Sequence, residues 1–304
     1  MAISKMPELC YHTLESEGGE SVQKQDDHNR QKKLAVINDF CGFGRCSIAA
    51  ALPVISAMHV QCCPLPTAVF SDHTGFESFY RVDFTQHMAR YSAEWEKLGL
   101  RFDGIATGYL GSARQIDLVK DFLARFKTKE TKVLIDPVMG DYGSLYPSFT
   151  QELAGRMHEL MGQADLLTPN LTEACILAGL PYREEFSQKE LEALCERLSE
   201  SGPSNIVVSG LHFGEEIGNF VWSGGKAELL TAKRVGPCRS GTGDVFSAIL
   251  AADLVNGVAL KKSVQKAADF ISKTMAYTLA LGVPETDGIC FEEYLWELGK
   301  ETAT

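Results

Sequence analysis

The chain has little positive charge and no long apolar stretch, and each shortage excludes a class of protein. It carries 29 Lys and Arg residues against 40 Asp and Glu residues over 304 positions, a net charge of -11. Nucleic acids and anionic membrane surfaces bind proteins through a basic footprint, so we expect neither as a partner. No segment approaches the roughly 20 apolar residues of a membrane span, and the N-terminus lacks the apolar core of a secretory signal. We therefore expect a cytoplasmic protein.

Paired cysteines are also missing. The nine cysteines are an odd number, and no two of them have the Cys-x-x-Cys spacing of a metal or redox site. Reduced cytosolic thiols are the natural interpretation.

Two familiar nucleotide-binding motifs are incomplete. The stretch GFGRCS at residues 42–47 nearly matches the dinucleotide fingerprint, but its third glycine is missing. The stretch QCCP at 61–64 has no acid where a ribose-binding carboxylate is expected. GGK at 224–226 lacks both the spacing and the following Ser or Thr of a Walker loop. These gaps disfavour a nicotinamide-dependent oxidoreductase and a P-loop enzyme.

The chain divides into a polar beginning and a long alternating remainder. Residues 1–33 have almost no aliphatic side chains after Leu14, so we expect a flexible N-terminal arm or a tag there. Residues 34–304 are expected to form one domain, in which short apolar runs alternate with amphipathic stretches such as the one behind the capping box SQKE at 187–190. The predicted strands are 34–38, 61–70, 104–108, 132–136, 165–168 and 205–209. This alternation indicates an α/β fold, with a mostly parallel central sheet and helices on both of its faces.

Polar side chains follow four of these predicted strands. They are Asn38 and Asp39, Tyr109, Asp136, and Thr168 with Asn170. In open parallel sheets, ligands bind beyond the carboxyl ends of the strands. We therefore expect these side chains to share one site.

The most informative stretch contains Gly241, Thr242, Gly243 and Asp244, directly before a predicted helix. Glycines let successive backbone N–H groups converge, and the positive end of a helix favours an anion lodged there. An acid at that helix start can take a proton from a hydroxyl that attacks the terminal phosphorus of a nucleotide. The motif therefore points to phosphoryl transfer.

Each candidate residue also has a plain structural interpretation. Asp136 precedes a proline, so it can simply be an acidic residue in a turn. Glu173 lies in the first turn of a predicted helix, where its charge can simply complement the helix dipole. Asp244 fits a helix cap. Thr67 and Tyr109 are residue types that more often serve packing than binding.

Five ordered motifs carry a resemblance to a known family. They are PLPTAVFSDHT at residues 64–74, TGYLGS at 107–112, DPVMGD at 136–141, TPNLTE at 168–173 and GTGD at 241–244. In these motifs the chain resembles the pyridoxal kinases of the ribokinase-like superfamily over about residues 34–282, and more narrowly their bacterial pyridoxamine kinase branch.

The resemblance implies ATP-dependent phosphorylation of the 5′-hydroxymethyl group of a vitamin B6 vitamer, in a ribokinase-like fold. Asp244 is then the base, and Gly241, Thr242 and Gly243 receive the migrating phosphoryl group. It also implies Mg²⁺ near Asp136 and Glu173, a possible requirement for a monovalent cation such as K⁺, and a homodimer. The remaining residues that it places on the ligands are Thr168, Asn170 and Ser209 for ATP, and Asn38, Asp39, Thr67 and Tyr109 for the vitamer.

Two other functions stay open at this point. One is a hydroxymethylpyrimidine kinase of the same superfamily, and the other is a non-catalytic B6-binding protein, which the intact Asp244 disfavours. The sequence also departs from the family in one place: pyridoxal kinases usually have a Ser followed by a polar ring residue after the first strand, where this chain has Asn38 and Asp39. The substrate is therefore less firmly predicted than the reaction.

Overall fold

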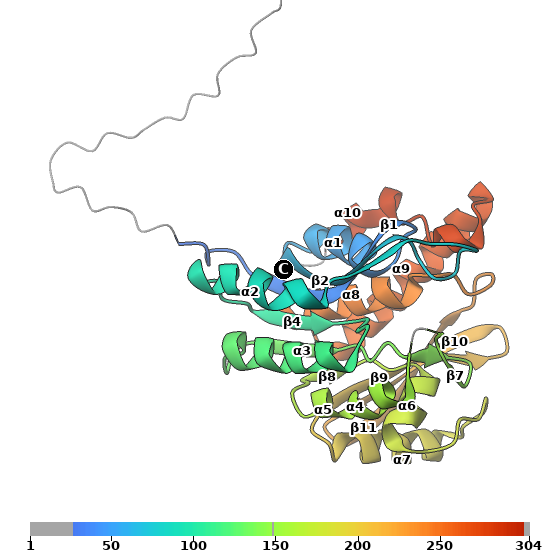
Figure 1. The fold of residues 1–304 in the computed structure, drawn as a ribbon. Helices are drawn as coiled ribbons and strands as arrows, with labels where there is room; N and C mark the ends of the chain where they lie inside the picture. The colour runs from blue at the N-terminus through green and yellow to red at the C-terminus, as the bar shows by residue number, and fades with distance from the viewer. Residues whose placement is uncertain (1–26, 148, 301–304) are drawn as a thin grey trace, which may run out of the picture.

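A nine-stranded sheet organises the protein, for which a computed structural model describes residues 27–147 and 149–300 (Figure 1). The strand order across the sheet is β11-β10-β9-β8-β5-β4-β1-β2-β3. The six neighbouring strands from β9 to β2 are parallel, while β3, β10 and β11 pair antiparallel at the two edges. The strands are β1 (Lys33–Phe43), β2 (Gln61–Asp72), β3 (Arg81–Asp83), β4 (Gly104–Thr107), β5 (Lys132–Ile135), β8 (Leu166–Leu167), β9 (Asn205–Phe213), β10 (Glu216–Ser223) and β11 (Lys226–Lys233).

Helices cover both faces of this sheet, as expected for buried parallel strands. One face packs against α1 (Ser47–Ala57), α8 (Thr242–Asn256), α9 (Leu260–Leu281) and α10 (Leu295–Leu298). The other packs against α2 (Thr85–Lys97), α3 (Ala113–Phe126), α4 (Gln151–Arg156), α5 (His158–Met161), α6 (Leu171–Ala178) and α7 (Gln188–Ser199). Successive strand residues alternate between the two cores: Val36 belongs to the first and Ile37 to the second. The predicted fold class is therefore confirmed.

All six predicted strands occur, but several extend beyond their predicted ends. The strand predicted to end at Asn38 continues to Phe43 after a register shift between Asn38 and Phe40 in its pairing with β2. The sequence 39–43 reads as a loop because it mixes polar and glycine residues, while pairing with a neighbouring strand keeps it extended. The glycine-containing stretch 214–226 forms β10, with turns at Gly214 and at Gly224 and Gly225. The capping box is confirmed, since Ser187 and Glu190 exchange both hydrogen bonds at the start of α7.

The boundary proposed between the arm and the domain falls inside the described part of the chain. Lys33 already pairs with Gln61 in the sheet. Asn29 lies just before it and is tied to the domain, because its amide donates to the Gly99 carbonyl and its Oδ1 accepts from the Arg101 N–H. Residues 1–26, the rest of the proposed arm, lie outside the described residues, so the arm stays a prediction.

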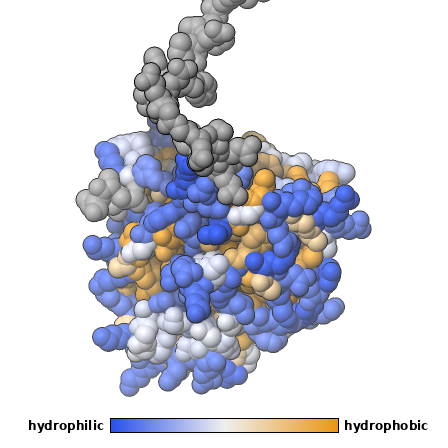
Figure 2. Space-filling model, turned by 90° about the vertical axis from the view of Figure 1, so that its left-hand side faces the viewer, coloured by the Kyte–Doolittle hydropathy of each residue, from blue (hydrophilic) through white to orange (hydrophobic). Residues whose placement is uncertain are grey.

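The surface on the side of α2 and α3 is mostly hydrophilic, with hydrophobic side chains showing between the polar ones (Figure 2). In the described ranges, every helix is too short or too polar to cross a membrane.

Candidate active site

A cavity of about 920 Å³ opens beyond the carboxyl ends of the parallel strands. Its walls bring together residues from the ends of β1, β4, β5, β8 and β9 and from the start of α8, as the topology of an open parallel sheet requires. All but one of the predicted site residues line it. The predicted residues that line the cavity are Asn38, Asp39, Tyr109, Asp136, Thr168, Asn170, Glu173, Ser209, Gly241, Thr242, Gly243 and Asp244.

The start of α8 is shaped by its two glycines. Gly241 is the residue before the helix and has a φ of 82°, which favours glycine, and a Cβ built there would overlap the Arg45 carbonyl oxygen. Gly243, inside the first turn, has open space where its Cβ would lie. The first requirement fixes the course of the backbone. The open space at Gly243 leaves the helix N-terminus accessible from the cavity, and backbone N–H groups at such a terminus attract anions.

Asp244 lies in this first turn, and its carboxylate is held by two donors. The Asn38 side-chain amide donates to its Oδ1 at 3.3 Å, and the Ser47 backbone N–H also bonds the carboxylate. Burial and the nearby negative charge of Asp39 raise the pKa of Asp244 to about 6, against the lowering effect of the two donors. A carboxyl with that pKa is ionised near neutral pH and still basic enough to accept a proton.

Asn38 holds the centre of this arrangement. Its Oδ1 accepts from the backbone N–H of Tyr109 at 2.7 Å and from that of Asp39 at 2.9 Å. A Cβ at Gly108 would meet the Asn38 amide at 2.5 Å, so a glycine is needed for the amide to lie there. Asn38 was predicted to bind substrate, and the structure gives it a second task, to orient Asp244 and the chain after β4.

Ser47 was missed in the sequence. It has a φ of 53°, uncommon for a residue other than glycine, and only 8% of it is exposed. This conformation turns its N–H toward Asp244, and its hydroxyl hydrogen-bonds Asp39. The Cys41 thiol also donates to Asp39, whose pKa burial raises. In the sequence, the segment 42–47 shows only an incomplete dinucleotide fingerprint, because the positive φ of Ser47 cannot be read from its residue types.

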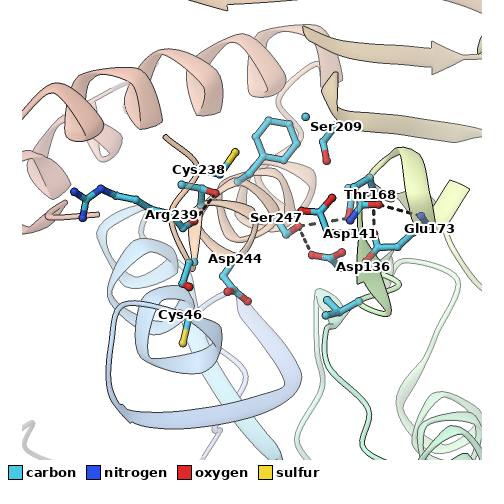
Figure 3. A pocket seen from close by; sticks show the side chains of 18 of the residues that line it. Cys46, Asp136, Asp141, Thr168, Glu173, Ser209, Cys238, Arg239, Asp244 and Ser247 are labelled. Atoms are coloured by element: carbon cyan, nitrogen blue, oxygen red, sulfur yellow. Dashed lines mark hydrogen bonds between the residues drawn. The ribbon is translucent and has the colours of Figure 1, made fainter. Parts of the chain in front are cut away.

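Asp136 and Glu173 form a second acidic group (Figure 3). The Ser247 hydroxyl donates to Asp136 at 2.6 Å, and Thr168 Oγ1 lies 3.5 Å from the Ser247 Oγ. Burial and the charge of Asp244 raise the pKa of Asp136 to about 7. Ser247 was also missed, although it follows Asp244 by three residues in a helix and therefore shares its face.

Glu173 lies in the first turn of α6 and is only 4% exposed. Its two oxygens accept from the backbone N–H groups of Met139 and Asn170, at 3.0 and 2.9 Å. Burial and the charge of Asp136 raise its pKa well above the usual value. Asn170 completes a capping box with it and donates its amide to the Gly140 carbonyl. Glu173 is therefore a helix-start acid, and its role beside Mg²⁺ stays a prediction.

The acidic group suits Mg²⁺. Its two buried carboxylates repel each other, and in the described ranges no Lys or Arg side chain hydrogen-bonds to either. A divalent cation would supply the missing charge, and hard oxygen ligands are those that Mg²⁺ prefers. The described residues contain no group of three or more His, Cys, Asp or Glu able to hold a metal alone.

Thr67 does not join the site. It is completely buried, does not line the cavity, and donates its hydroxyl to the Tyr109 carbonyl at 2.8 Å. The expectation that Thr67 contacts the substrate is corrected: it supports Tyr109 from behind. The Tyr109 ring does line the cavity, where it meets Phe70 edge to face with ring centroids 6.1 Å apart.

Comparisons with known proteins identify the family. Residues 43–287 match the profile of the phosphomethylpyrimidine kinase family. A putative phosphomethylpyrimidine kinase from Bacteroides thetaiotaomicron, crystallised with pyridoxal, superposes with a TM-score of 0.85 at 35% identity, over 88% of this chain and 96% of that one.

Two curated relatives are similar in sequence. The pyridoxal kinase PdxY of Pasteurella multocida is 27% identical over 88% of this chain and 96% of that protein. The hydroxymethylpyrimidine/phosphomethylpyrimidine kinase of Haemophilus influenzae is 33% identical over 58% of this chain and 65% of that enzyme. With a ribokinase-like fold, a GTGD helix start inside the cavity and a profile match across most of its length, the chain belongs to the phosphomethylpyrimidine kinase family, whose members include pyridoxal kinases.

Proposed function

We propose that the protein transfers the γ-phosphoryl group of ATP to the 5′-hydroxymethyl group of a vitamin B6 vitamer. The observation that carries this proposal is Asp244, a carboxylate with a pKa of about 6 beside an accessible helix N-terminus at Gly241 to Gly243. The similarity to a protein crystallised with pyridoxal and to a pyridoxal kinase supports the choice of acceptor.

In the proposed reaction, the hydroxymethyl oxygen attacks the γ-phosphorus while the bond from that phosphorus to the β,γ-bridging oxygen breaks and ADP leaves. Asp244 accepts the hydroxyl proton, and Asn38 and Ser47 hold its carboxylate in place during the transfer. Backbone N–H groups of Gly241, Thr242 and Gly243 stabilise the charge on the migrating group. When bound near Asp136 and Glu173, Mg²⁺ neutralises phosphate charge.

The proposed acceptor lies against Tyr109, with Asn38 and Asp39 at the register shift inside β1. The nucleotide occupies the side of Thr168, Asn170 and Ser209. Asp244 accepts a hydrogen bond from Asn38 on the acceptor side, and its charge acts on Asp136, which follows β5 between β4 and β8. In-line transfer needs the attacking oxygen, the phosphorus and the leaving oxygen in one line, with the base beside the attacking hydroxyl.

A second candidate activity is phosphorylation of hydroxymethylpyrimidine, because the family profile and the Haemophilus influenzae relative carry that name. Coupled ADP release with pyridoxal, pyridoxine, pyridoxamine and hydroxymethylpyrimidine tests both. The B6 proposal requires the highest kcat/KM on one of the three vitamers, and a preference for the pyrimidine would replace it. ADP release with none of the four would favour the non-catalytic B6-binding alternative.

We also propose that the protein is a cytoplasmic homodimer and that a monovalent cation such as K⁺ supports its activity. Light scattering of the purified protein measures its mass in solution. Assays in which K⁺ is replaced by tetramethylammonium test the cation.

A further inference from the structure

Asn219 presents a buried side-chain amide to the cavity. The residue lies in β10, is 5% exposed and lines the cavity wall. Among the described residues, no hydrogen bond reaches its side chain. Buried polar groups nearly always have a partner, so an amide without one, on a cavity wall, calls for a ligand.

A β-bulge in β9 lies directly opposite Asn219. Gly218 pairs with Leu211 and Phe220 pairs with Val208, so Ser209 and Gly210 of β9 together lie opposite the single residue Asn219. Such β-bulges re-aim side chains and are frequent next to active sites. Gly210 has a φ of 71°, and the Ser209 N–H turns away to the Pro169 carbonyl. Two features independent of each other therefore mark this place, the bulge and the amide.

The surroundings of Asn219 are mostly apolar. Val221, two residues along the strand and thus on the same face, packs in the core under α8 and α9, whereas Phe220 packs in the opposite core. Asn219 therefore faces α9, where Ala268 and Ile271 form the other wall of the cavity. An apolar slot with one amide is suited to a flat heteroaromatic ring that has polar atoms on one edge.

The place of Asn219 in the sheet indicates which ring this is. The acceptor groups lie at β1 and β4, the acidic group begins at β5, and β10 lies three strands beyond β5. Three strand spacings are about 14 Å, a distance that the polyphosphate and ribose of a nucleotide can bridge. The base of a nucleotide whose phosphates lie at Asp136 and Gly241 would therefore reach the slot.

We infer that the Asn219 amide hydrogen-bonds the adenine base of the nucleotide and makes the protein prefer adenine. The amide carries one acceptor and one donor group, which match the exocyclic amine of adenine and the neighbouring ring nitrogen. This inference rests on the proposed use of ATP and adds the residue that recognises its base.

Calorimetric binding of ADP, without any acceptor, tests the inference. The comparison nucleotide is purine riboside 5′-diphosphate, which has hydrogen in place of the adenine amine. We expect the wild-type protein to bind ADP about ten-fold more tightly than this analogue, and Asn219→Leu to reduce that preference to less than about two-fold. Because leucine removes an unpartnered polar group, the ligand-free variant should also melt at a temperature equal to or above that of the wild type.

Asn205→Leu is the matched control. Asn205 lies in the same sheet but outside the cavity, and its amide is fully engaged with the Asp165 carbonyl and the Ser223 hydroxyl. Its loss should lower stability and leave the nucleotide preference unchanged.

Either of two results would overturn the inference: equal binding of the two nucleotides by the wild type, which needs no variant, or an undiminished preference in Asn219→Leu. A wild-type protein that prefers ADP and phosphorylates no vitamer would overturn the proposed function instead.

Discussion

The side-chain amide of Asn38 donates to Oδ1 of Asp244 across 3.3 Å, joining two residues 206 positions apart in the chain. The oxygen of this amide accepts from the Tyr109 N–H, so one side chain connects β1, the chain after β4 and the start of α8. Base and acceptor pocket are thereby held in a fixed relation, which is what positional catalysis requires.

Asp244→Asn should abolish turnover while nucleotide binding stays close to that of the wild type. The proposed task of the carboxylate is to accept a proton, and general-base contributions are typically about 10²–10⁴-fold. Steady-state kcat and calorimetric ADP affinity measure the two effects separately. A variant that keeps more than about a third of the wild-type kcat would remove Asp244 from the role of base.

The pH profile of kcat/KM should fall on the acid side near pH 6. Asp244 must be ionised to act as a base, and burial with the Asp39 charge raises its pKa to about 6, so activity is lost as the pH falls through that value. Asp39→Asn removes a negative charge, lowers the pKa of Asp244 and should move this limb to lower pH. An unchanged limb in the variant would show that Asp39 does not act on Asp244.

Asp39→Asn should also change the choice of vitamer. Asp39 lines the cavity, and pyridoxamine carries an ammonium where pyridoxal has a neutral aldehyde. A hydrogen bond to a charged group contributes about 1.5–3 kcal/mol, so the variant should lose about ten-fold or more in kcat/KM for pyridoxamine relative to pyridoxal. Equal losses for both vitamers would leave Asp39 as a residue that only orders the turn through Ser47 and Cys41.

The core of the fold was predictable because buried parallel strands have continuous apolar sequences. The segments 104–108 and 132–136 illustrate this, since each matches its strand to within a residue. The antiparallel strands β10 and β11 were less visible, because antiparallel strands can contain polar residues that resemble a loop. Strand β1 was cut short at Asn38, where its register with β2 shifts.

The site was predictable where a residue's role follows from a local motif. Gly241, Gly243 and Asp244 line the cavity together, as the order of glycines and acid before a helix indicated. Ser47 and Asn219 escaped because their roles depend on a strained φ and on a bulge in a neighbouring strand. Neither feature can be seen in one sequence without knowing which strands pair.

Glu173→Gln should raise the Mg²⁺ concentration needed for half-maximal rate, and so should Asp136→Asn, because each removes an anionic partner of the metal. The glutamine also places an NH₂ group against a backbone N–H, so some stability is lost as well. The Mg²⁺ dependence of the rate and the melting temperature separate the two effects.

Glu190→Gln is the matched control for that experiment. Glu190 closes the same kind of capping box with Ser187 at the start of α7, outside the cavity. It should lower the melting temperature without changing the metal dependence. If Glu173→Gln and Asp136→Asn both behaved like this control, the two acids would be only helix-start and turn residues.

Gly241→Ala and Gly243→Ala should fail for different reasons. At Gly241 the backbone φ is 82°, and an added methyl group would overlap the Arg45 carbonyl, so the variant should lose stability and melt at a clearly lower temperature.

At Gly243 an added methyl group has no atom within 4 Å, and alanine favours a helix over glycine by about 0.5–1 kcal/mol, so stability should be kept or improved. The new methyl group would instead occupy space beside the N–H groups that receive the phosphoryl group. We therefore expect Gly243→Ala to lose about ten-fold or more in kcat/KM for ATP, while its melting temperature does not fall. Wild-type kinetics in that variant would mean that the phosphoryl group does not lie on the first turn of α8.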